Sequence, residues 1–200
     1  MRYIVMADGK GSRWENYSGV SKHLVEINGE TLLARITNLL RKYDKNAEVI
    51  ITAHKKEYET EGAVLYAPLH NEFEIDRFTR ELIDDNICFL YGDTYYSEEA
   101  IKTIVETEAD DLLFFGADKS IVAVKIKDGD LFRKHFERVR KLFVEGKIKQ
   151  CIGWQVYLSF QNLDLEKKQI ADKFILFNDS TCNFNSPDDI QRFFKTEESV

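Results

Sequence analysis

The chain has 200 residues and a formal net charge of −7, which is the size of one ordinary α/β domain. The acidic balance argues against non-specific binding to nucleic acid or to an anionic membrane surface. Hydrophobic residues make up 44% of the chain and aromatic residues 12%, enough for a core and unlike a disordered protein.

Cysteine usage and the apolar segments indicate a location. Cys88, Cys151 and Cys182 are an odd number without Cys-x-x-Cys spacing, as expected in a reducing compartment and without a zinc site. The N-terminus has no basic stretch followed by a long apolar run, and no segment approaches the ~20 apolar residues of a membrane span. We therefore expect a soluble cytoplasmic protein with no signal peptide, built as one domain over residues 1–200.

The chain opens on a short apolar run, residues 3–7, which is rich in β-formers and stopped by glycine, and this predicts a buried strand. Gly9 and Gly11 follow, and glycine lets a backbone approach a ligand closely. Successive N–H groups in such a loop bind anions. Arg13 and Lys22 add positive charge nearby. The segment therefore indicates a polyphosphate site.

Two common phosphate motifs are excluded. No glycine pair in the chain fits the P-loop pattern G-x-x-x-x-G-K-[ST]. The dinucleotide fingerprint G-x-G-x-x-G needs a third glycine where this chain has Trp14.

The remaining chain alternates predicted strands and helices. A short extended piece at 24–27 comes first, and further strands are predicted at 47–52, 63–66, 87–91, 112–115, 121–126, 153–160 and 174–177. Helices are predicted at 31–43, 54–61, 74–84, 97–107, 131–143 and 187–194. This alternation predicts βαβ units and a mainly parallel sheet. The strands at 112–115 and 121–126 could instead form an antiparallel pair.

A carboxylate stands directly after one predicted strand. Asp93 follows residues 87–91 through Gly92, and ligands of open α/β sheets bind at the carboxyl ends of the strands. Mg²⁺ prefers oxygen ligands, typically one or two carboxylates plus phosphate oxygens. Asp93 is therefore a candidate Mg²⁺ ligand. The alternative is that Gly92 and Asp93 form a turn that caps a helix.

The opening pattern resembles that of the nucleotidyltransferases of GT-A-like fold. These include sugar-phosphate, phosphocholine and methylerythritol-phosphate nucleotidyltransferases and the molybdenum cofactor guanylyltransferase. Their pattern L-A-[AG]-G-x-G-x-R, then P-K-x-L, stands here in residues 6–13 and 21–24, and the match continues through Leu33. Two positions depart, because Asp8 replaces a small residue and Ser21 replaces proline.

The resemblance implies roles for individual residues. It implies a mixed, mainly parallel sheet flanked by helices, with a Rossmann-like nucleotide-binding half. Arg13 and Lys22 would be catalytic, and Asp93 would hold Mg²⁺. The nucleotide-binding residues would be Ala7, Asp8, Gly9, Lys10, Gly11 and Ser12.

The second metal ligand has two candidates. Residues 182–190 resemble the family's "[DN]-[IV]-[DN]-T-P-E-D-[LI]" segment, which maps the metal-reaching position onto Asn185. An amide supplies only a neutral carbonyl oxygen, so Asp179 is an alternative ligand. An ordinary helix start at Pro187 would also account for this sequence without a metal.

Other polar and aromatic side chains have structural explanations that we favour. Arg77 or Arg80 could face an acceptor phosphate, but a solvated helix face is expected. Trp154 and Tyr157 could line an acceptor pocket, but core positions are expected. His23 and His54 are expected on the surface. Relatives contact base or acceptor in the loop that here contains His70, Asn71 and Glu72.

The resemblance implies transfer of a nucleoside monophosphate from a nucleoside triphosphate to a phosphorylated small molecule, with release of pyrophosphate. Cytidylyl transfer is favoured, because no second domain is evident. A guanylyltransferase of the molybdenum cofactor type is the nearest alternative. A non-catalytic nucleotide- or sugar-phosphate-binding protein is another, and a homodimer stays open. A glycosyltransferase would show Asp-x-Asp where this chain has residues 93–95.

Overall fold

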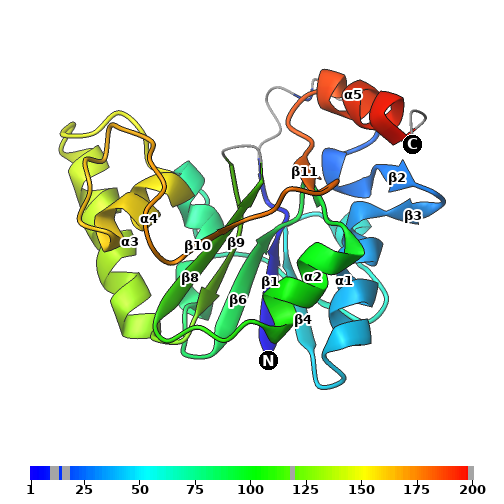
Figure 1. The fold of residues 1–200 in the computed structure, drawn as a ribbon, viewed down its shortest axis with the longest axis horizontal. Coiled ribbons are helices and arrows are strands. Elements are labelled where there is room, and N and C mark those ends of the chain that lie inside the picture. Colours follow the sequence, from blue (N-terminus) through cyan, green and yellow to red (C-terminus); the bar gives the residue numbers. More distant parts are fainter. Residues whose placement is uncertain (10–13, 15–18, 118–119, 198–200) are drawn as a thin grey trace.

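A seven-stranded sheet forms the centre of the computed structural model, which describes residues 1–9, 14, 19–117 and 120–197 (Figure 1). The strand order is β10-β8-β9-β6-β1-β4-β5. These strands are β1 (Arg2–Met6), β4 (Glu48–Thr52), β5 (Val64–Tyr66), β6 (Ile87–Tyr91), β8 (Leu112–Ala117), β9 (Ser120–Ile126) and β10 (Phe174–Leu176).

Most strand pairs in this sheet are parallel. β1 pairs in parallel with both β4 and β6, so the residues that follow these three strands meet at one edge. β9 runs antiparallel to both β6 and β8. The prediction of a mixed, mainly parallel sheet is confirmed, and so is the antiparallel pair.

Helices cover both faces of the sheet, as Figure 1 shows. α1 (Leu32–Tyr43) and α2 (Glu98–Glu106) pack on one face. α3 (Gly129–Val144) and α4 (Gly153–Phe160) pack on the other. The apolar faces of these helices and of the strands form two core clusters, one on each side of the sheet.

Side-chain caps fix where three of these helices begin. Thr31 Oγ1 accepts from Ala34 N at the start of α1, and Ser97 Oγ accepts from Ala100 N at the start of α2. Asp128 does the same for α3. Each cap satisfies an N–H group that the helix itself leaves unpaired.

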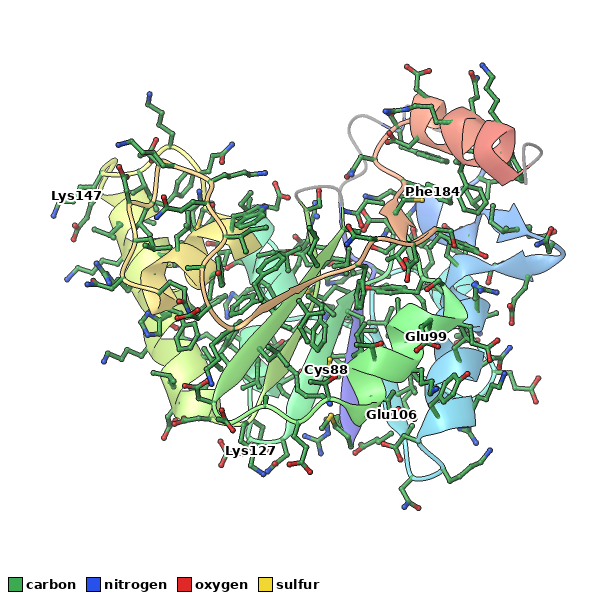
Figure 2. The ribbon with its side chains drawn as sticks, viewed as in Figure 1. Cys88, Glu99, Glu106, Lys127, Lys147 and Phe184 are labelled. Atoms are coloured by element: carbon green, nitrogen blue, oxygen red, sulfur yellow. The ribbon has the colours of Figure 1, made fainter. Side chains whose placement is uncertain are left out.

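A third, smaller cluster lies beyond the carboxyl edge of the sheet. Phe184 is fully buried there beneath α5 (Pro187–Glu197), as Figure 2 shows. Its framework also contains two short pairs, β2 (Glu26–Ile27) with β3 (Glu30–Thr31) and β7 (Thr94–Tyr95) with β11 (Cys182–Asn183). The cluster therefore brings the C-terminal segment back to the chain that follows β6.

The predicted strand at residues 153–160 was wrong, because this segment is the helix α4. Seven of its eight residues are buried, so it lacks both the alternation of a half-exposed strand and the apolar stripe of a surface helix. Periodicity alone does not separate a buried helix from a buried strand.

The helix predicted at residues 74–84 is two 3-10 turns, η4 (Glu74–Phe78) and η5 (Arg80–Leu82). Thr79 between them has φ +32, which breaks the helical path. The helix predicted at 54–61 is only the turn η3 (Lys56–Tyr58), and the extended piece at 24–27 begins with the turn η2 (Lys22–Leu24).

Among the described residues, no helix combines the length and the apolar composition that crossing a membrane requires.

Candidate functional site

The candidate site lies at the edge where β1, β4 and β6 end. Ala7, Asp8 and Gly9 follow β1, His54 stands two residues beyond β4, and Asp93 follows β6. Parallel pairing places these strand ends side by side. The crevice at this edge is the usual ligand site of open α/β sheets.

Gly92 allows the chain to turn into this edge. Its N–H donates to Met6 O over 2.9 Å, and a Cβ atom at position 92 would lie 2.9 Å from the same oxygen. Only a residue without a side chain fits so close to the neighbouring backbone. Gly92 thereby fixes the position from which Asp93 projects.

Lys22 and Asp93 form a buried ion pair. Lys22 Nζ donates to Asp93 Oδ2, and each side chain is only 7% exposed. Burial opposes ionisation of Asp93, but the charge of Lys22, the hydrogen bond from Lys22 and the charge of Arg77 act against it, and the pKa of Asp93 lies below its ordinary value. Two residues that the sequence assigned to separate roles are thus brought into contact.

Ser21 preserves the backbone that proline would give before Lys22. Ser21 has φ −63 and ψ 140, an extended conformation within the narrow range that a proline ring allows. Its hydroxyl donates to Glu57 Oε1 over 3.2 Å. The departure from the family pattern therefore leaves the path into the lysine unchanged.

His23 is buried next to this pair, although we expected it on the surface. It is 2% exposed and packs edge-on against Tyr58 at 5.4 Å between ring centroids. Within the described part of the chain its Nδ1 has no hydrogen-bond partner. Burial lowers the pKa of His23 to about 3, so the ring is neutral beside Lys22 near neutral pH. The exposed His54 fits its prediction better, since its side chain is 53% exposed.

A cavity of about 590 Å³ opens beside Asp93. Asp93 and Asn185 line it together with Arg77 and Tyr91, and the turn that leads into α4 forms another part of its wall. Phe184 N donates to Asp93 O over 2.8 Å, which holds residue 185 next to the residues after β6. The structure therefore places the two predicted metal ligands in one cavity.

Asp179, the alternative metal ligand, is engaged elsewhere. Its carboxylate accepts from Ser97 Oγ over 2.7 Å and from Thr181 N over 2.8 Å. It lines a neighbouring cavity of about 400 Å³ that Asn185 also lines, but not the cavity of Asp93. Its contacts fasten the C-terminal segment to the start of α2.

Arg77 lies in the cavity rather than on a solvated helix face, which corrects our expectation. Its side chain is 21% exposed, and a Cβ atom at Gly9 would lie 3.2 Å from its Cζ. Arg77 therefore lies against Gly9, the first glycine of the predicted phosphate-binding segment, which we call the glycine loop. Arg80, which we considered equally, instead pairs with Glu137 over 2.8 Å.

Asp8, which departs from the family pattern, is held by two neighbouring loops. Its Oδ2 lies 2.9 Å from His54 Nδ1 and accepts from Asn71 Nδ2 over 2.7 Å. Asn71 Nδ2 also donates to Asp8 O over 2.8 Å. We call Asp8, His54 and Asn71 the Asp8 latch. It ties the end of β1 to the segments that follow β4 and β5.

The aromatic residues of α4 divide between two environments. Trp154 is 4% exposed and contributes to both the core and the cavity wall. Tyr157 is fully buried in the core, as expected. Of the loop residues, Glu72 lines the cavity. The predicted residues Lys10, Gly11, Ser12 and Arg13 lie outside the described residues.

The donor atoms suit a cation that completes its shell from a ligand. Among the residues that the structure describes, no three His, Cys, Asp or Glu side chains gather into a metal site. Next to the end of β6, the cavity instead offers the carboxylate of Asp93 and the amide of Asn185. Mg²⁺ is commonly held by one or two carboxylates while phosphates and water supply the rest. The residues present therefore fit Mg²⁺ bound together with a polyphosphate.

Solved structures share this architecture along almost the whole chain. The CTP:phosphocholine cytidylyltransferase from Streptococcus pneumoniae superposes with a TM-score of 0.60 at 14% identity, covering 98% of both chains. The 4-diphosphocytidyl-2C-methyl-D-erythritol synthase from Anaerococcus prevotii gives 0.62 at 15% identity, covering 98% of this chain and 95% of that one. This chain has the GT-A-like nucleotidyltransferase fold.

A further solved structure of this fold is named for a sugar phosphate. A putative glucose-1-phosphate thymidylyltransferase from Bacillus anthracis superposes with a TM-score of 0.63 at 12% identity, covering 100% of this chain and 96% of that one. No protein-family model matches the chain, and neither does any curated protein sequence. The likeness is therefore one of nucleotidyltransferase fold, and the chemistry must be argued from the residues of the site.

Proposed function

We propose that the protein transfers a nucleoside monophosphate from a nucleoside triphosphate to a phosphorylated small molecule and releases pyrophosphate. The observation that carries this proposal is that Asp93 contacts Lys22 and shares a cavity with Asn185. Three segments far apart in the sequence thus supply one cation, one carboxylate and one amide oxygen at the edge where open α/β sheets bind their ligands.

The reaction needs little covalent assistance from the protein. An oxygen of the acceptor phosphate attacks the α-phosphorus, and the bond from that phosphorus to the bridging β-oxygen breaks. The electron pair leaves with pyrophosphate. The attacking phosphate is already a nucleophile at neutral pH, so no general base is required. Catalysis then consists mainly of positioning and charge stabilisation.

The described residues divide these tasks. Lys22 would interact with the α-phosphate and the charge that develops there, and Arg77 would face the acceptor phosphate. Asp93 with Asn185 would hold Mg²⁺, which when bound supplies positive charge against the triphosphate oxygens. The residues around Gly9 would lie against the nucleotide, and Arg13 would stabilise the leaving pyrophosphate, as the sequence resemblance implies.

Release of pyrophosphate tests this proposal directly. Each of CTP, UTP, GTP and ATP is incubated with Mg²⁺ and a panel of phosphocholine, polyol phosphates and sugar phosphates. CTP is the first choice, because two of the solved structures of this fold named above are cytidylyl enzymes by name. Guanylyl transfer would be detected in the GTP series. Absence of pyrophosphate with every pair would reject the transferase.

One observation favours a second candidate, a nucleotide-binding protein without transferase activity. Lys22 is already paired with Asp93, so each charge is neutralised by the other. Calorimetry with the same four nucleotides separates the two functions. Nucleotide binding without pyrophosphate release supports the binding protein, whereas release supports the transferase.

A further inference from the structure

The cavity beside Asp93 has a positively charged wall that the proposed phosphoryl chemistry does not use. Lys149 and Lys168 line it together with Trp154, from the segments on either side of α4. Asp93 and Asn185 line the same cavity from other segments, after β6 and after β11. We call Lys149 and Lys168 the lysine pair.

Each carboxylate of the cavity contacts a cation outside the lysine pair. Glu72 pairs over 2.8 Å with Arg140, which also pairs with Asp76 over 3.2 Å. Glu74 pairs with Arg77 over 3.5 Å, and Asp93 pairs with Lys22. Among the described residues, no ion pair joins either member of the lysine pair to a carboxylate. Glu166 contacts the backbone N–H of Lys149 over 3.0 Å, but the two ammonium groups of the lysine pair are left available to a ligand.

Two aromatic side chains that line the cavity, Trp154 and Phe73, are also covered by the protein's own groups. Lys168 Nζ lies 5.3 Å from the ring centroid of Trp154, and Phe174 stacks on the same ring at 5.5 Å. Arg140 Cζ lies 5.0 Å from the ring centroid of Phe73. A ligand with an organic cation binds best to an uncovered ring next to an unpaired carboxylate, and these rings and carboxylates do not offer that.

We propose that the acceptor carries a second anionic group, a carboxylate or a phosphate on a sugar or polyol, and that the lysine pair binds it. The identity of the ligand as acceptor rests on the transferase proposed above. The first phosphate faces Arg77 and Asp93, and the second anion faces Lys149 and Lys168. A cavity of about 590 Å³ is within the range of small-molecule sites and has room for more than a phosphate.

Binding of three probes tests the proposal. Glucose 1-phosphate and glucuronic acid 1-phosphate differ by one carboxylate, and phosphocholine carries a cation instead. Titration calorimetry is done on the full chain with Mg²⁺ and a CTP analogue whose α–β bridging oxygen is replaced by methylene. We expect glucuronic acid 1-phosphate to bind about fivefold tighter than glucose 1-phosphate, the order of one exposed charge contact. Phosphocholine should bind most weakly.

Variants identify the groups responsible. In the double variant Lys149→Gln with Lys168→Gln, the two sugar phosphates should bind equally well. Lys167→Gln is the matched control, because Lys167 pairs with Asp164 over 3.3 Å and does not line the cavity. It should keep the full preference. The preference should also weaken as salt is raised.

The outcomes separate the two proposals. Three results would overturn the second-anion proposal. Phosphocholine could bind more tightly than the sugar phosphates, the double variant could keep the preference for glucuronic acid 1-phosphate, or no probe could bind. If the preference holds and disappears in the double variant while no nucleotide yields pyrophosphate, the transferase is rejected and the anion site stands.

Discussion

Lys22 and Asp93 are 71 positions apart in the sequence and meet as an ion pair that is nearly closed to solvent. The lysine comes from the turn after the glycine loop, and the carboxylate from the chain that leaves the central strand β6. Two halves of the site therefore depend on each other for charge balance. Removal of one partner leaves the other buried and uncompensated.

The first prediction concerns this pair. Lys22→Met or Asp93→Asn alone should lower the free energy of unfolding by about 3–5 kcal/mol, because breaking a buried pair strands a charge. The double variant should be more stable than the sum of the two losses predicts. Denaturant unfolding of the wild type and the three variants measures this coupling. Strictly additive losses would contradict it.

The same variants test the chemistry. Lys22→Met should reduce pyrophosphate release by about 10²-fold or more, the usual effect of losing one preorganised charge contact. Lys22→Met should stay inactive under conditions in which denaturant unfolding shows that it is folded. Wild-type activity of the folded variant would show that Lys22 acts on folding alone.

The buried His23 should make stability fall in mild acid. Burial holds its pKa at about 3, compared with 6.5 in the unfolded chain, so the unfolded state binds more protons between these values. The stability that the neutral ring preserves is therefore complete above pH 6.5 and is lost as pH falls, by up to about 1.4 kcal/mol per pH unit. Unfolding free energies should be measured from pH 7 to about 5.5, where ordinary carboxylates are still mostly ionised.

Substitution isolates the contribution of His23. His23→Gln should flatten the slope of stability against pH, whatever its effect on absolute stability. His135 is the matched comparison, because burial also lowers its pKa, while Ser159 Oγ lies 2.9 Å from its Nδ1. His135→Gln should flatten the slope less. A slope unchanged in His23→Gln would show that the ring does not govern the acid response.

Asn185 should set how much Mg²⁺ the protein requires. Asn185→Asp replaces a neutral amide oxygen with a carboxylate in the cavity of Asp93, and hard cations bind charged oxygens more tightly. The Mg²⁺ concentration for half-maximal pyrophosphate release should fall about tenfold, and Asn185→Ala should raise it. Asn183→Asp is the control, because Asn183 Oδ1 accepts from Thr94 Oγ1 over 2.5 Å. An equal effect of Asn185→Asp and Asn183→Asp would show that added negative charge, rather than a ligand at position 185, changes the Mg²⁺ requirement.

The Asp8 latch should control nucleotide affinity rather than turnover. Asp8→Ala restores a small side chain of the family type but removes the carboxylate contacts to His54 and Asn71. Because the latch holds the residues that lead into the glycine loop, KM for the nucleotide should rise several-fold with little change in kcat. Asn71→Ala should do the same. A fall in kcat at constant KM would assign Asp8 to the chemical step instead.

The sequence pattern predicted the central sheet well because its strands are locally distinctive. The apolar segments that became β1, β4 and β6 are short, rich in β-formers and stopped by glycine or polar residues. The helix α4 was mistaken for a strand because it is buried nearly all round. It also carries Trp154 and Tyr157, whose aromatic side chains are common in strands.

The predicted site was only partly recoverable from sequence order. Asp93 and Asn185 could be predicted as ligands of one Mg²⁺ ion by resemblance, because each belongs to a local motif. The ion pair of Asp93 with Lys22 depends on a close approach of two segments, and no local pattern encodes it. Arg77 entered the cavity because Thr79 ends its helical turn with a positive φ, which a threonine in an ordinary helical pattern does not reveal.

The return of the chain through β11 has a consequence for biosynthesis. All seven strands of the central sheet are complete by Leu176, yet Asn185 and the cover provided by α5 come afterwards. A chain that has emerged only as far as Leu176 holds every strand of the central sheet but still lacks Asn185 in the wall of the ligand cavity. Competence to bind would thus be acquired after the architecture is already in place.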